Sequence, residues 1–75
     1  MMLIKVKLFA TFRKNRFKEK DMELAEGASV EWVIDFLKIP RKELGVVFIN
    51  GLSASPESVL KDGDTLSIFP MVGGG

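Results

Sequence analysis

The residues of this sequence best suited to chemistry are its last ones, Gly73, Gly74 and Gly75, which follow Pro70-Met71-Val72. Glycine loses more backbone entropy on ordering than any other residue, so a run of glycines after a strand-like segment does not help a fold. A tail without side chains can enter a narrow channel in another protein and present one reactive group, the α-carboxylate of Gly75. We therefore expect residues 71–75 to form a flexible glycine tail that acts as a substrate.

The composition excludes most catalytic chemistry for the chain itself. The 75 residues include no cysteine and no histidine. Thiolate nucleophiles, imidazole catalysis, disulfides and the usual zinc sites are therefore excluded. There is no Gly-x-x-x-x-Gly-Lys-Ser/Thr phosphate loop, so any ATP must be bound by a partner. We expect a protein that is not an enzyme and that binds no cofactor and no metal.

The charge pattern gives no reason to expect a nucleic acid or a membrane as partner. The formal net charge is +1, and acidic neighbours offset the basic run in residues 13–20. We interpret that run as a solvated loop and strand edge. Lys5 and Lys7 interrupt the apolar start, so we expect no signal peptide, and no segment approaches transmembrane length. A cytoplasmic location is expected.

Alternating apolar residues predict a sheet with one helix. The predicted strands are residues 3–9, 18–24, 46–49 and 65–69, with a brief edge strand at Leu52. Residues 10–17 are interpreted as a loop. Ser29 is a good N-cap for a helix that ends near Lys38. Asp62 and Asp64 flank a glycine and are assigned to turn chemistry rather than to a catalytic carboxylate pair.

This order of elements predicts an α+β fold of the β-grasp (ubiquitin-like) class. One helix must cover one face of a mixed sheet of four to five strands, because a helix stripe and a sheet face each need a partner. The first and last strands are expected to pair in parallel at the centre. We expect a single domain over residues 1–70, followed by the tail.

Strict alternation also predicts aromatic side chains on the outer face of the sheet. If Ile4, Val6 and Leu8 point to the helix, Phe9 points away from it, and Phe69 does the same on the last strand. Both would lie at the end from which the tail leaves. We expect a protein-docking patch there. The alternatives are that these rings fold over into the core or are exposed singly.

The register of residues 46–49 decides whether a third ring joins this patch. Phe48 joins it if Val47 and Ile49 are the inward pair, and the sequence leaves that register open. The docking surface is expected to continue along Met71 and Val72 into the tail.

Trp32 and Phe36 lie one helical turn apart on a flank of the apolar stripe. Aromatic pairs at this spacing usually belong to the core, so we expect the segment of Leu44 or of Leu52 to cover them.

Three segments of the chain resemble a known family. They are Val6-Lys7-Leu8-Phe9-Ala10, Leu60-Lys61-Asp62-Gly63-Asp64 and Phe69-Pro70-Met71-Val72-Gly73-Gly74-Gly75. Together they resemble the small subunit of molybdopterin synthase (MoaD-type) and its thiazole-forming relative (ThiS-type), which are ubiquitin-like sulfur carriers. The resemblance extends over the whole chain. Met71 departs from the family, which usually has a second proline there, and Gly73 takes a position that the family leaves variable.

The resemblance implies a mechanism in which partners act on the tail. An E1-like adenylating enzyme (MoeB/ThiF-type) uses ATP to activate the carboxylate of Gly75, and a sulfur donor system converts it to a thiocarboxylate. The tail then enters a large molybdopterin synthase subunit (MoaE-type) and gives its sulfur to a pterin precursor. The alternatives are a thiazole pathway, attachment to lysines as a protein modifier, or a non-catalytic β-grasp interaction module whose glycines are incidental.

Overall fold

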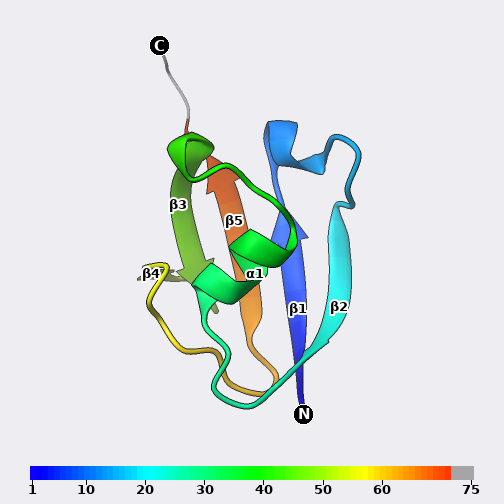
Figure 1. The fold of residues 1–75 in the computed structure, drawn as a ribbon, viewed down its shortest axis with the longest axis vertical. Helices are drawn as coiled ribbons and strands as arrows, with labels where there is room; N and C mark the ends of the chain where they lie inside the picture. The colour runs from blue at the N-terminus through cyan, green and yellow to red at the C-terminus, as the bar shows by residue number, and fades with distance from the viewer. Residues whose placement is uncertain (72–75) are drawn as a thin grey trace.

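Five strands form one mixed sheet in the order β2-β1-β5-β3-β4 (Figure 1). The strands are β1 (Met2–Leu8), β2 (Glu19–Leu24), β3 (Leu44–Ile49), β4 (Leu52–Ala54) and β5 (Thr65–Pro70). One helix, α1 (Val30–Phe36), and two short 3-10 helices, η1 (Ala10–Arg13) and η2 (Arg41–Glu43), connect them. The computed structural model describes residues 1–71.

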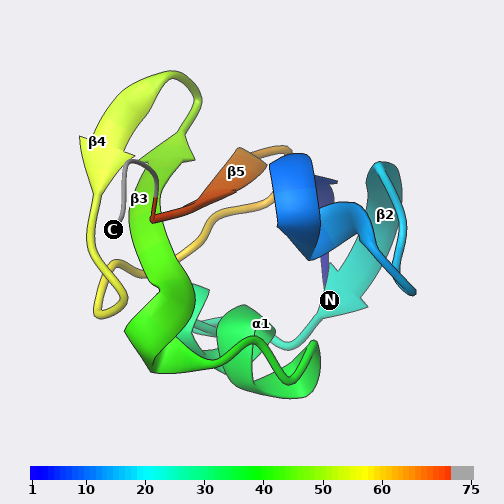
Figure 2. The same ribbon diagram turned by 90° about the horizontal axis from the view of Figure 1, so that it is seen from above.

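The first and last strands pair in parallel next to one another, as predicted. Lys5 lies opposite Thr65 and Leu8 lies opposite Ile68, while β2 and β3 flank this pair in antiparallel orientation. Seen along the strands, the sheet curves around α1, which lies on its concave side (Figure 2). The predicted β-grasp architecture is confirmed.

The core lies between the sheet and α1. Alternate residues of β1 and β5 point into it because successive side chains of a strand face opposite sides. Its fully buried members from the two strands and the helix are Met2, Ile4, Val6, Leu8, Leu66, Ile68, Val30, Val33 and Ile34.

The helix begins where the sequence predicts and ends earlier. The hydroxyl of Ser29 accepts a hydrogen bond from the backbone N–H of Trp32 at 3.3 Å, as an N-cap does. Leu37 is the C-cap, and Lys38 has a φ of 58°. The guanidinium of Arg16 donates to the carbonyls of Leu37 and Lys38 at 3.2 and 3.3 Å, which satisfies groups that a helix end leaves without partners.

The loop predicted for residues 10–17 is wrong over its first half. Ala10–Arg13 form η1, and Phe12 is only 1% exposed and belongs to the core. Arg13 and Arg16 brace this segment. Nε of Arg13 donates to the carbonyl of Leu8 at 2.7 Å, and Nη1 of Arg16 donates to that of Phe12 at 3.2 Å. Two residues of the basic run, Arg13 and Arg16, therefore stabilise the fold.

The prediction that Trp32 and Phe36 belong to the core is also wrong. Their exposed fractions are 47% and 60%. Leu44 and Leu52 both begin strands of the sheet, so neither can cross the outer surface of a helix that packs on that sheet.

Within residues 1–71, no helix is long and apolar enough to span a membrane.

Candidate docking site at the base of the tail

The parallel register of β1 and β5 brings two phenylalanines together. Leu8 pairs with Ile68, and the residue that follows each of them, Phe9 just after β1 and Phe69 within β5, is a phenylalanine that faces away from α1. The rings of Phe9 and Phe69 stack, with centroids 4.0 Å apart and an interplanar angle of 8°. The sequence predicted this meeting from alternation and strand direction.

Phe48 completes the cluster. It lies opposite Ser67 on the neighbouring strand, and its ring meets that of Phe69 edge-on, at 5.7 Å and 89°. Val47 is buried and Ile49 packs against the core, so the register left open by the sequence is the one that turns Phe48 outward. We call Phe9, Phe48 and Phe69 the aromatic patch.

The patch is neither part of the core nor three separate exposed rings. Each ring is half-buried, because the rings cover one another on the outer face of the sheet. The guanidinium carbon of Arg13 lies 5.3 Å from the ring centroid of Phe9, so a cation borders the apolar surface. Sequence reasoning assigned Arg13 to a solvated loop and missed this contact.

An apolar groove of about 410 Å³ continues from the patch toward the tail. Its lining residues are Leu44, Gly45, Val46, Phe69, Pro70 and Met71. Phe69 belongs to both the patch and the groove, so the two form one surface. Met71, an expected docking residue, is 64% exposed at the end of that surface. Val72 and Gly73–Gly75, the other expected site residues, lie outside the described residues.

Gly45 allows the end of the last strand to approach closely, because it has no side chain. A Cβ at this position would lie 2.5 Å from the carbonyl oxygen of Pro70 and 2.9 Å from the backbone nitrogen of Met71, closer than atoms can pack. The strands are irregular here, with a register shift between Leu44 and Val47. The N–H of Met71 donates to the carbonyl of Glu43 at 2.8 Å. The chain is therefore fixed up to the point where the tail begins.

Sequence reasoning missed Gly45, although a signal was available. The predicted strand began at residue 46, whereas β3 begins at Leu44 and contains Gly45. A glycine beside or inside a strand pattern often marks a bulge or a close approach of two backbones. The sequence could not say which backbone approaches, because Pro70 is far away along the chain.

Comparison with known proteins assigns the family. A family model described as the ThiS family matches residues 6–75. The chain belongs to the ThiS family. The predicted relation to MoaD/ThiS-type ubiquitin-like proteins is thereby confirmed. No curated protein sequence matches the chain.

Solved structures similar to this ThiS-family chain come from several organisms. A Pyrococcus furiosus protein assigned as molybdopterin converting factor subunit 1 is 34% identical, with a TM-score of 0.77 over 96% of this chain and 100% of that one. Small archaeal modifier protein 1 from Methanosarcina acetivorans is 28% identical, with a TM-score of 0.73 over 100% of this chain and 98% of that one.

A third structure shares the fold at lower identity. It is a complex of subunits 1 and 2 of the molybdopterin-converting factor from Helicobacter pylori. The matched chain is 20% identical, with a TM-score of 0.67 over 99% of this chain and 100% of that one.

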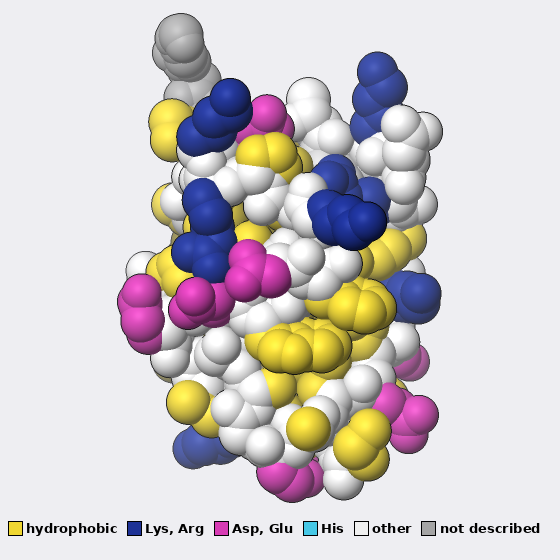
Figure 3. Space-filling view, in the orientation of Figure 1, with side chains coloured by type: hydrophobic (Ala, Val, Ile, Leu, Met, Phe, Trp, Pro, Cys, Tyr) yellow, Lys and Arg dark blue, Asp and Glu magenta, His cyan; other side chains and the backbone are white. Residues whose placement is uncertain are grey.

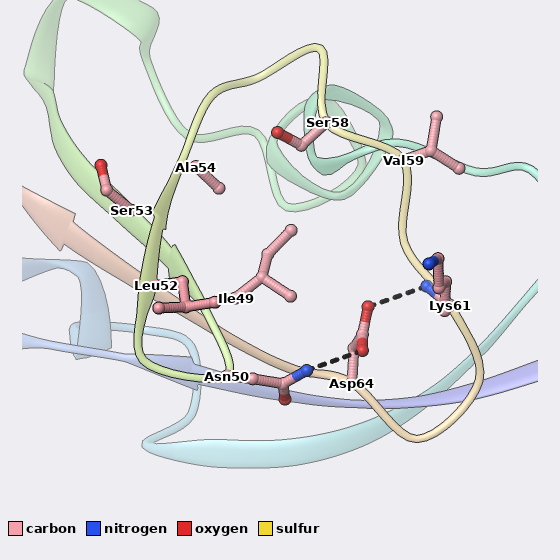
Figure 4. Close-up of a pocket in the computed structure, with 9 residues that line it drawn as sticks. All are labelled: Ile49, Asn50, Leu52, Ser53, Ala54, Ser58, Val59, Lys61 and Asp64. Carbon is pink, nitrogen blue, oxygen red and sulfur yellow. Dashed lines mark hydrogen bonds between the residues drawn. The ribbon is translucent and has the colours of Figure 1, made fainter.

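The opposite end of β5 holds the Asp-Gly-Asp turn and a second hollow of about 340 Å³ (Figure 4). The carboxylate of Asp64 accepts from the backbone N–H of Lys61 at 2.8 Å and from Nδ2 of Asn50 at 2.9 Å. Asp62 accepts from the N–H of Leu3 at 2.8 Å. The assignment of both aspartates to turn chemistry is confirmed. Across residues 1–71, no cluster of acidic side chains is arranged to hold a metal ion.

We predict that Gly45→Ala releases the base of the tail. The added methyl group must push Pro70 and Met71 away, so the hydrogen bond from Met71 to Glu43 is lost at a cost of about 1–3 kcal/mol in stability. Amide hydrogen exchange of Met71 should accelerate at least about tenfold. Val46→Ala, at an exposed neighbouring position, is the control and should leave this exchange rate unchanged. Unaltered protection of Met71 in Gly45→Ala would contradict the assigned role of Gly45.

Proposed function

We propose that this ThiS-family chain is a sulfur carrier whose terminal carboxyl group, on Gly75, is adenylated and then converted to a thiocarboxylate. The sulfur is passed to a pterin precursor in the synthesis of molybdopterin, the organic part of molybdenum and tungsten cofactors. The observation that carries the proposal is the continuous apolar surface at the point where the tail leaves, formed by the aromatic patch and the groove. The family match, which includes the final glycines, supports it.

The chemistry assigns the chain the role of co-substrate. A carboxylate is a poor acyl donor, because its leaving group would be an oxide. Attack of the Gly75 carboxylate on the α-phosphorus of ATP gives an acyl adenylate and releases pyrophosphate. A sulfur nucleophile then attacks the carbonyl carbon, and AMP leaves as the C–S bond forms. An E1-like adenylating enzyme of MoeB/ThiF type binds the ATP and catalyses the first step, so the chain itself binds no cofactor.

The body of the chain supplies docking and the tail supplies reach. The half-buried rings of the aromatic patch offer a rigid apolar surface, which costs little entropy when a partner covers it. The three terminal glycines, fully extended, reach roughly 10 Å beyond that surface. A partner can therefore bind the folded body outside its channel while the carbonyl of Gly75 enters.

The partner that receives the tail for the final sulfur transfer to the pterin precursor is a large synthase subunit of MoaE type. The Pyrococcus furiosus relative is assigned as molybdopterin converting factor subunit 1, and the Helicobacter pylori relative was solved together with subunit 2. Both support a large subunit as partner of the chain. In the proposed pathway the chain meets the activating enzyme first and this large subunit afterwards. These steps belong in the cytoplasm, where ATP and the pterin precursor are available.

A second candidate function uses the same activated tail for protein modification. The 28% identity with small archaeal modifier protein 1 favours it. In that case a lysine amine, rather than a sulfur nucleophile, attacks the activated carbonyl and forms an isopeptide bond. Because the matching family model is that of the ThiS family, a thiazole pathway is a further candidate for the use of the sulfur.

Thiocarboxylate formation tests the proposal. The chain is incubated with ATP, sulfide and an E1-like enzyme, and its intact mass is measured. We expect a mass gain that equals the exchange of one oxygen for sulfur, located at Gly75 by fragmentation. A chain that lacks Gly74 and Gly75 is the control and should show no gain. Absence of the gain in the full chain would overturn the proposal. A second assay, conversion of the pterin precursor with a large subunit, separates the molybdopterin pathway from a thiazole pathway and from protein modification.

We also predict that Phe69→Ala weakens binding to the activating enzyme at least about tenfold, because Phe69 lies at the centre of the patch and also lines the groove. The loss of ring stacking should cost about 0.5–1.5 kcal/mol of stability, to which the lost burial of this partly exposed ring adds, and the variant should remain folded. Titration calorimetry measures the affinity. Phe36→Ala, an exposed phenylalanine on the other layer, is the matched control and should bind normally. Equal effects of the two variants would show that the aromatic patch is not the docking site.

A further inference from the structure

The outer face of α1 carries an aromatic pair that neither the core nor the proposed docking surface uses. The rings of Trp32 and Phe36 stack with centroids 5.1 Å apart and an interplanar angle of 9°. About half of each side chain is in contact with solvent. Val30, Val33 and Ile34 already bury the inner side of the helix. The aromatic pair is therefore surplus to the packing of this chain, which is typical of an interaction surface.

One side of the pair is acidic. Successive helical residues are about 100° apart, so Glu31 and Asp35 form a stripe next to Trp32 and Phe36. Nη2 of Arg41 lies 3.2 Å from the carboxylate of Glu31 and 3.4 Å from that of Asp35. The hydrogen bond to Glu31 raises the pKa of Arg41 above its ordinary value. Two carboxylates and one guanidinium leave this rim with a net negative charge.

The other side of the pair is basic. Lys20 points to the helix side of the sheet, because Met22, two residues along the same strand, is buried there. Nζ of Lys20 lies 5.8 Å from the ring centroid of Phe17, which packs against the core. The guanidinium of Arg16 is fixed at the C-terminal end of α1 by the helix carbonyls. Figure 3 shows hydrophobic side chains gathered over α1. Acidic side chains lie to their left with basic ones just above these, other basic side chains lie above and to the right of the hydrophobic ones, and further acidic ones lie at the lower right.

We propose that two copies of this chain pair through this face about a twofold axis. An isologous interface requires one surface that is complementary to itself. A twofold axis that passes through the aromatic pair places the acidic rim of each copy against the basic rim of the other, while the Trp32–Phe36 pairs meet at the centre. Opposite charges on two sides of one apolar centre are the arrangement that such an axis needs.

The interface should be weak because it is small. The whole chain exposes 4780 Å², and a stable interface of standard size buries about 800 Å² from each partner. A single two-turn helix face offers less than that. We therefore expect dissociation constants between about 10 µM and 1 mM.

Pairing through α1 leaves the proposed docking surface accessible. The aromatic patch lies on the outer face of the sheet, by strand register and alternation. Helix α1 lies on the concave face (Figure 2). Each copy in the pair can therefore still present its patch and tail. The inference does not depend on the proposed function, because self-association is measured on the chain alone.

The one tryptophan of the sequence makes the interface directly observable. Sedimentation equilibrium from about 5 µM to 1 mM should show the mean mass rising toward that of a dimer. Over the same range the emission of Trp32 should shift to the blue, and its quenching by acrylamide should fall about twofold, because the indole becomes buried. A chain that stays monomeric to about 1 mM would overturn the proposal.

Substitutions then locate the interface. Phe36→Ser should weaken the dimer at least about tenfold. Phe69→Ala, on the sheet face, should leave the dimer unchanged. A dimer that depends on Phe69 and tolerates Phe36→Ser would use the sheet face, which would contradict the proposal.

A charge exchange tests the twofold arrangement independently of stability. Asp35→Lys and Lys20→Glu should each weaken the dimer about three- to tenfold, because each places like charges opposite one another. The double variant, which carries both substitutions, restores opposite charges across the axis and should recover most of the lost affinity. If the two losses simply multiply, the two rims do not face one another and the proposed arrangement is wrong.

Discussion

The parallel pairing of β1 with β5 is the interaction on which the rest of the molecule depends. It joins the start of the chain to its end in the middle of the sheet, and it buries Val6 and Leu66 side by side under α1. The same register places Phe9 beside Phe69 on the opposite face. Because parallel strands end at the same edge, the stacked rings lie where the chain leaves the sheet. One backbone register therefore determines the core, the aromatic patch and the exit point of the tail.

The described residues hold their chain end in place, and the sequence that follows them is chemically simple. Backbone contacts hold the chain as far as Met71, through the close approach at Gly45 and the hydrogen bond to Glu43. A docked partner thus meets a surface whose position relative to the exit is fixed, which lowers the entropy lost on binding. In the proposed mechanism, this surface recognises the partner and the terminal carboxylate reacts. The residues that bind the partner are therefore separate from the group that reacts.

Local patterns predicted the architecture, and non-local contacts explain what they missed. Strand alternation, the Ser29 cap and the Asp-Gly-Asp turn act within a few residues, so the sequence alone indicates them. Periodicity showed on which side of α1 Trp32 lies, but it could not show whether another segment covers that side. Phe12 lies just before a basic run, without any period to mark it as core. Gly45 matters only because Pro70, distant in sequence, packs against it.

The measurement that tests the central claim most directly is ATP–pyrophosphate exchange catalysed by the E1-like enzyme, because it reports the acyl adenylate itself. We expect rapid exchange with the full chain and none when one alanine is appended after Gly75, since the added methyl group blocks the channel and displaces the carboxylate. The folded body and the aromatic patch are identical in the two chains. Exchange that persists with the extended chain would contradict the claim that the Gly75 carboxylate is the reactive group.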